Sequence, residues 1–196
     1  MTLPAPTIDT FPHNWTADVL RTPPLIAPAR QFTYPQQVPG EEDTLARGAV
    51  LVNVKPASAP NFLATCALGF TNPRLPSGVF STPNPASLLA LAGGYAYLID
   101  TTAPETCLHL PIRPVEQLVA VPDSGLILLA GFHEILALGA TGVRWQTARL
   151  SWEGLTLNRI ADNHLHGTGW HMPSNRDLPF TVDLNTGHHT GGGVTA

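Results

Sequence analysis

Histidine is the residue type whose spacing in this sequence first suggests chemistry. Five of the eight histidines lie at or after position 164. His164 and His166 are two residues apart, so on a β-strand they share one face, where with His171 they have the ligand type of a zinc site. The spacing fits no zinc motif, and polar side chains on the wet face of an edge hairpin are the simpler interpretation. We predict no metal and no other cofactor, with His164, His166 and His171 as the alternative metal site.

The sequence also contains residues that could carry out acid/base catalysis, but in no diagnostic motif. Asp162, Asp177 and Asp183 lie among the late histidines, and a small metal-dependent or acid/base hydrolase would use such pairs. His133-Glu134 begins like the zinc-protease motif HExxH, but position 137 is alanine and the segment has the pattern of a strand instead of the required helix. A hydrolase is therefore an alternative function, and no catalytic residue is predicted.

Tryptophan and arginine gather in the same part of the chain. The segment Arg144 to Trp152 alternates between the two residue types, and Trp170 precedes a polar loop that is inserted relative to the repeats described below. Surfaces that bind other molecules are enriched in both types, although tryptophans can equally pack between sheets. The predicted binding residues are Arg144, Trp145, Trp152, Trp170, His171, Arg176 and Asp177.

The composition excludes several classes of protein. Charged residues make up 12% of the 196 residues, and the 17 glycines and 20 prolines argue against a helical bundle. Lys55 is the single lysine and the arginines form no run, so we expect neither a nucleic acid nor a membrane as partner. Cys66 and Cys107 form no CxxC motif and are predicted to be buried thiols. No signal peptide is recognised, which predicts a cytoplasmic protein.

An internal repeat indicates the architecture that must position these residues. Ser87–Ile112 and Gly125–Leu150 align without a gap and share the plan strand, tight turn, strand, turn, strand. The identical pairs are Leu88/Leu126, Leu91/Leu129, Ala92/Ala130, Gly93/Gly131 and Leu98/Leu136. Runs such as Leu126–Ala130 are apolar at every position, which predicts strands covered on both faces.

A third, degenerate copy follows the first two. Ile160–Leu165 matches Val121–Leu126, and Thr181–Gly187 matches Leu136–Gly142 after an insertion around residues 173–177. Repeats of about 40 residues, each a small antiparallel meander, are typical of β-propeller blades.

Two turns carry a resemblance to known proteins. Asp183-Leu-Asn-Thr-Gly187, and Gly139-Ala-Thr-Gly142 followed by Trp145, resemble the hairpins of PQQ-type and WD40-like propeller blades. The resemblance covers roughly residues 87–193 and extends to an uncharacterised family of bacterial proteins that has no assigned function. It implies a propeller-like fold and no particular activity.

The first 47 residues differ from the rest of the chain. They carry eight of the 20 prolines, which interrupt strands and helices, together with apolar side chains such as Trp15, Leu25 and Ile26. We predict a proline-rich arm, residues 1–47, that packs its aromatic side chains on a β-repeat domain of residues 48–196. The expected fold is all-β: repeated antiparallel meanders that form a small or incomplete propeller, or alternatively a β-sandwich.

Three functions fit these observations. A non-catalytic β-repeat module that binds a protein or a small-molecule ligand is favoured, because repeats are present and no catalytic motif is recognised. The alternatives are the hydrolase and a structural homo-oligomer in which symmetry completes the propeller.

Overall fold

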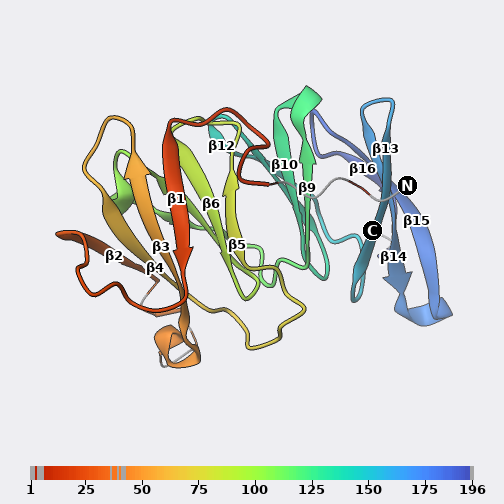
Figure 1. Ribbon diagram of the computed structural model, residues 1–196. Helices are drawn as coiled ribbons and strands as arrows, with labels where there is room; N and C mark the ends of the chain where they lie inside the picture. The colour runs from red at the N-terminus through yellow and green to blue at the C-terminus, as the bar shows by residue number, and fades with distance from the viewer. Residues whose placement is uncertain (1–2, 4–6, 36, 39, 41–42, 195–196) are drawn as a thin grey trace.

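The chain folds into four small β-sheets of four strands each, which follow one another along the sequence (Figure 1). The computed structural model describes residues 3, 7–35, 37–38, 40 and 43–194. Within these residues the only helical segments are short 3₁₀ turns, and no helix is long and apolar enough to cross a membrane. The predicted all-β class is confirmed.

Sheets 2, 3 and 4 are simple meanders, in which each strand pairs antiparallel with the next. Sheet 2 consists of β5 (Gly78–Ser81), β6 (Ser87–Ala92), β7 (Tyr95–Asp100) and β8 (Leu108–His109). Sheet 3 consists of β9 (Gln117–Val121), β10 (Leu126–Ala130), β11 (Ile135–Gly139) and β12 (Gly142–Gln146). Sheet 4 consists of β13 (Leu155–Ala161), β14 (His164–His171), β15 (Arg176–Asp183) and β16 (His189–Gly191). The prediction of repeated, blade-like meanders is confirmed.

The sequence repeats occupy equivalent places in these sheets. The first copy contains β6 and β7, and the second contains β10 and β11, which are the two inner strands of sheets 2 and 3. The third copy supplies the corresponding strands β14 and β15 of sheet 4, with the insertion at their connecting turn. Gly93 and Gly94 connect β6 to β7 with positive φ angles of 53° and 82°, as a two-residue hairpin requires.

Sheet 1 is built differently. Its strand order is β1 (Trp15–Leu20), β3 (Ala49–Pro56), β4 (Phe62–Ala67) and β2 (Arg30–Tyr34), and β2 runs parallel to β4. Two segments of the predicted arm are therefore the outer strands of a sheet. The reason is the placement of the prolines, which fall at 12, 23, 24, 28 and 35 and leave both segments free to form ladders.

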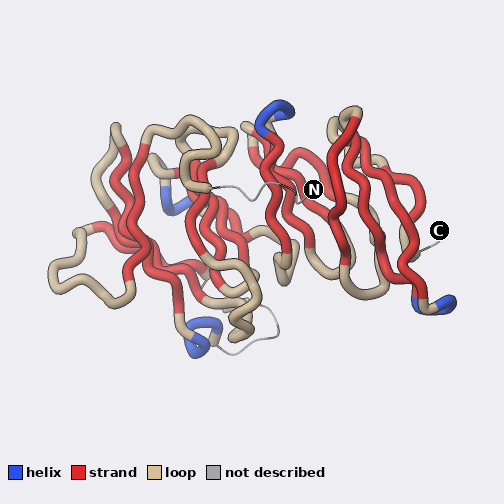
Figure 2. The backbone as a smooth tube through the Cα atoms, turned by 45° about the vertical axis from the view of Figure 1, so that its right-hand side comes forward, coloured by secondary structure: helices blue, strands red, loops and turns tan. Residues whose placement is uncertain are grey.

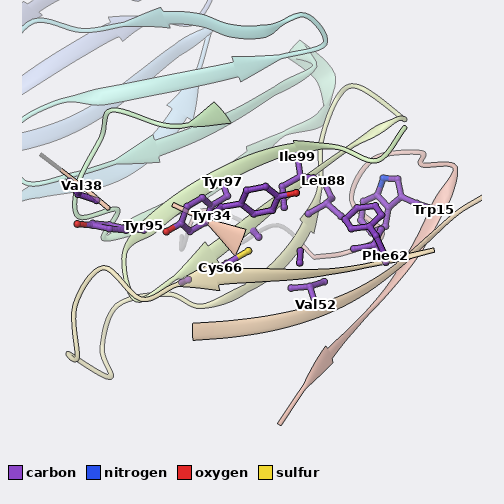
Figure 3. Close-up of a cluster of buried hydrophobic side chains, with 14 residues drawn as sticks. Trp15, Tyr34, Val38, Val52, Phe62, Cys66, Leu88, Tyr95, Tyr97 and Ile99 are labelled. Atoms are coloured by element: carbon purple, nitrogen blue, oxygen red, sulfur yellow. The ribbon is translucent and has the colours of Figure 1, made fainter. Parts of the chain in front are cut away.

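The core is divided into three apolar layers, one between each pair of neighbouring sheets. The layer between sheets 1 and 2 contains Phe62 and Tyr97, and Figure 3 shows its aromatic side chains packed together. Leu91 and Leu129 belong to the layer between sheets 2 and 3, and Phe180 belongs to the layer between sheets 3 and 4. Every residue of β6 and β10 is buried, which confirms that the inner strands are covered on both faces. Four stacked sheets also replace the alternative of a two-sheet sandwich.

The N-terminal segment contributes to all three layers. Leu3 packs against the layer between sheets 3 and 4, Phe11 lies in the layer between sheets 2 and 3, and Trp15 lies in the layer between sheets 1 and 2. Phe11 N–H donates to Ser81 Oγ at 2.8 Å, and Trp15 Nε1 donates to the Ser87 carbonyl at 3.3 Å. Residues 1–2, 4–6, 36, 39 and 41–42 of the predicted arm lie outside the described residues.

Sheets 1 and 4 lie at opposite ends of the stack, so the arrangement is open (Figures 1 and 2). Each end sheet has one face toward the core and one face toward solvent. The burial of β14 shows this alternation, because Leu165, Gly167 and Gly169 are buried while the residues between them are only half-buried.

Candidate functional site

Trp145 belongs to the core and not to an exposed recognition surface. It is 8% exposed in the layer between sheets 3 and 4, and its Nε1 donates to the Leu184 carbonyl at 2.8 Å. Its ring packs against Gly187, where a Cβ would lie 2.7 Å from the ring. The Thr-Gly turn that resembles propeller hairpins therefore serves here to admit a tryptophan, and Trp145 is removed from the predicted binding residues.

Arg144, the neighbour of Trp145, points to solvent at a different place from the other predicted binding residues. It lines a hollow of about 330 Å³ between turns of sheets 3 and 4, together with Ser124 and Asn185. Trp152 is the sixth residue after the end of β12, and its backbone N–H donates to the Trp170 carbonyl at 3.0 Å. Trp152 and Trp170 therefore lie together, without Arg144.

The two half-buried tryptophans are fixed by polar contacts within the fold. The Arg149 guanidinium lies 5.1 Å from the Trp152 ring centroid, and its Nη2 donates to the Trp152 carbonyl at 2.8 Å. Trp170 Nε1 donates to Asn175 Oδ1 at 3.1 Å. The Arg149–Trp152 contacts thus lie within the segment that connects β12 to β13, and the Trp170–Asn175 bond lies within the β14–β15 hairpin.

The remaining predicted binding residues lie at the end of the β14–β15 hairpin, beside these tryptophans. His171 pairs with Arg176 and Trp170 pairs with Asp177 across the two strands. His171 Nδ1 is 2.7 Å from Ser174 Oγ, within the inserted turn. The structure thus places these residues at one end of a hairpin, with Trp170 and Asp177 on the opposite face from His171 and Arg176, and a role for them in binding stays a prediction.

The three histidines of the alternative metal site do not converge. His164 and His166 share the outer face of sheet 4, where His166 Nδ1 lies 3.3 Å from Thr181 Oγ1. His171 is five residues beyond His166 on the same strand, which at about 3.3 Å per residue is too far for a shared metal ion. In the described part of the chain, no three His, Cys, Asp or Glu residues form a metal-binding group.

The acid/base pair of the hydrolase alternative stands on an open surface. His164 Nε2 lies 3.9 Å from Asp183 Oδ2, and the two side chains are 42% and 30% exposed. Hydrogen bonds to Asp183, first of all from the Thr186 hydroxyl, lower the pKa of its carboxyl group. Asp183 therefore stays ionised at neutral pH and is a poor general acid.

The most exposed apolar side chains described lie in the loop of residues 21–29, which connects β1 to β2. Leu25 is 106% exposed and Ile26 is 91% exposed. The loop projects from the sheet 1 end of the stack, at the left of Figures 1 and 2. A loop held by Pro23, Pro24 and Pro28 carries both side chains past the edge of the sheet.

A hollow lies between this loop and the outer face of sheet 1. Its volume is about 720 Å³, and it is lined mainly by apolar groups, among them Leu20, Pro24, Ile26, Pro28 and Pro60. Leu25 is not among the lining residues, so it projects beside the hollow. An apolar projection and an apolar hollow therefore lie next to each other at one end of the molecule.

The charges at this end are largely paired. Arg30 Nη2 lies 3.7 Å from Glu105 Oε2, and Lys55 Nζ lies 3.4 Å from Asp18 Oδ2. We name this surface, the loop of residues 21–29 with the outer face of sheet 1, the loop end. In the sequence, the exposed residues of the loop end are marked only as apolar residues in a proline-rich segment. The same description fits Phe11 and Trp15, which are buried, so the sequence did not distinguish the two groups.

The two cysteines are free thiols of low reactivity. Cys66 is buried and Cys107 is half-buried in the layer between sheets 1 and 2. Burial raises the pKa of the Cys66 thiol and raises that of Cys107 to about 12. Both thiols are therefore protonated at neutral pH, and neither is an activated nucleophile.

Comparison with known proteins adds a distant structural likeness. No protein family matches the sequence, and no curated protein is a significant match. Among solved structures, the N-terminal domain of Nup159 aligns with a TM-score of 0.36 at 12% sequence identity, over 96% of this chain and 51% of that chain. The chain thus spans about half the length of that structure, and the resemblance to bacterial blade-repeat proteins stays a prediction.

Proposed function

We propose that this chain is a non-catalytic interaction module and that the loop end binds a protein. The observation that carries the proposal is the nearly complete exposure of Leu25 and Ile26 beside an apolar hollow of about 720 Å³. Burying a leucine or isoleucine side chain is worth about 1.5–3 kcal/mol, and clustered apolar groups left in water mark contact surfaces.

A protein fits this surface better than a small molecule does. A small ligand would fill the hollow but leave Leu25 in water, because Leu25 projects beside the hollow. A protein surface with its own depression can bury Leu25 and fill the hollow in one contact. The three prolines of the loop also restrict its conformations, which reduces the entropy lost on binding.

The position of the His164–Asp183 pair, the candidate acid/base pair, supports a non-catalytic module. Active sites form in concave pockets that exclude water. The His164–Asp183 pair instead lies on the outer face of sheet 4, and neither residue lines the hollow beside Arg144 or the hollow at the loop end.

Site-specific photo-crosslinking tests the proposal. A Leu25→Cys variant can carry a benzophenone on the new thiol, because both native thiols are held protonated by burial. We expect a probe at position 25 to form a protein adduct on irradiation in an extract of native host cells mixed with the purified chain.

A matched control is the same probe in a Met172→Cys variant, since Met172 is 49% exposed and lies in the hairpin of sheet 4. Equal labelling from positions 25 and 172, or no adduct from position 25, would contradict the proposal.

A further inference from the structure

We infer that the partner at the loop end is a second copy of this chain, related to the first by a two-fold axis. The inference rests on the proposed function, since it names the partner of the same surface. In a two-fold contact each copy uses the same patch, so the patch must contain both a projection and the depression that receives it.

The loop end meets this requirement within a few residues. Leu25 is fully exposed and does not line the hollow, whereas Ile26, its neighbour, forms part of the hollow's wall. A two-fold axis beside the loop directs Leu25 of each copy into the hollow of the other. Ile26 then packs against the leucine that enters. Leu20 and Pro60, on the sheet side of the hollow, complete the apolar surroundings of that leucine.

Two of the basic side chains at the loop end are already paired within one copy. The side chains of Arg30 and Lys55 are paired with Glu105 and Asp18, so neither adds much repulsion between two copies, whereas Arg21 at the start of the loop is exposed and has no ion pair among the described residues. The same pairing reduces the attraction to anionic lipid head groups, which depends on unneutralised basic side chains.

The other end of the stack limits assembly to two copies. The outer face of sheet 4 presents polar side chains, among them His166, Thr168 and Thr181. A face of this kind stays in water, as the outer faces of terminal repeats do. Among the described residues the two most exposed large apolar side chains, Leu25 and Ile26, both lie at the loop end, so the contact closes on itself and does not continue into a filament.

Analytical ultracentrifugation over a wide range of concentrations tests the inference. We expect wild-type protein to form a dimer in reversible equilibrium with monomer, and Leu25→Asp to raise the dissociation constant at least about 100-fold, because both copies lose a central contact. Met172→Asp, which changes an exposed apolar residue at the other end, should dimerise as wild type does. Far-ultraviolet circular dichroism verifies that each variant is folded.

Crosslinking separates the two proposals. If wild type stays monomeric and the probe at position 25 captures a different protein, a second copy is excluded while the interaction module stands. If wild type is monomeric and the probe captures nothing, both proposals fail. A dimer that Leu25→Asp leaves intact, or that Met172→Asp disrupts equally, places self-association elsewhere and overturns the inference.

Discussion

The two ends of the stack share a strand pattern but present different chemistry to solvent. In sheet 4 the outward positions are histidine, threonine and aspartate, with His164, His166 and Thr168 in a row along β14. In sheet 1 the outward side of β1 ends at Leu20, beneath a loop that exposes Leu25 and Ile26. Strand alternation buries the inner face of either end sheet, so the outward residues alone distinguish the polar sheet 4 end from the loop end, which we propose contacts a partner.

The largest expected effects test whether the inner faces of the two ends are equivalent. Phe62 of sheet 1 is 0% exposed and Phe180 of sheet 4 is 2% exposed, each in the apolar layer beside its sheet. Phe62→Ala and Phe180→Ala should each lower the free energy of unfolding by about 3–5 kcal/mol, because each leaves a cavity in a packed layer. Urea denaturation measures both losses.

Substitutions on the outer faces are the controls. Thr181→Ala, at the position next to Phe180, loses the 3.3 Å contact with His166 Nδ1 and should lower the free energy of unfolding by no more than about 1.5 kcal/mol. A loss below about 1 kcal/mol for either phenylalanine would show that one end sheet is attached more loosely than the other.

A smaller effect should follow from making the sheet 4 end apolar. Thr156 and Thr168 are directly opposite each other on β13 and β14, with Thr156 exposed and Thr168 half-buried. In a Leu25→Asp background, the double change Thr156→Val and Thr168→Val should cause concentration-dependent association that light scattering detects. Valine suits strands as well as threonine does, so the free energy of unfolding should change by less than about 1 kcal/mol.

The outcome decides what keeps this end free of partners. If the double variant stays monomeric at every concentration, the polar outer face is not what prevents association at sheet 4. The polarity of the outward residues would then not explain how the two ends differ.

Much of the fold was predictable because the repeat and the turns are local signals. Gly93-Gly94 marks the turn between β6 and β7, and the uninterrupted apolar run of β10 indicates coverage on both faces. The parallel pairing of β2 with β4 was not predictable, since it depends on a long connection with no sequence pattern. The exposed residues of the candidate site could not be predicted from residue type. Trp145 and Leu25 are both apolar, and only their tertiary positions make one buried and the other exposed.

The smallest expected effect concerns pH dependence at the sheet 4 end. Asp183 Oδ1 accepts hydrogen bonds from the Thr186 hydroxyl at 3.0 Å and from the Thr186 backbone N–H at 2.9 Å. The hydroxyl is the main cause of the lowered pKa of Asp183 in the folded state. A lowered pKa stabilises the fold above the carboxyl's ordinary value of about 4, and the stabilisation is lost as the pH falls through the folded-state pKa.

Thr186→Val removes the hydroxyl donor, so its deficit in the free energy of unfolding should be present at neutral pH and shrink in acid. Urea denaturation at a series of pH values measures that deficit, with Thr190→Val, an exposed threonine on β16, as the control that should show no pH-dependent difference. A deficit of equal size at every pH would mean that the hydroxyl acts through turn geometry instead of through the charge of Asp183.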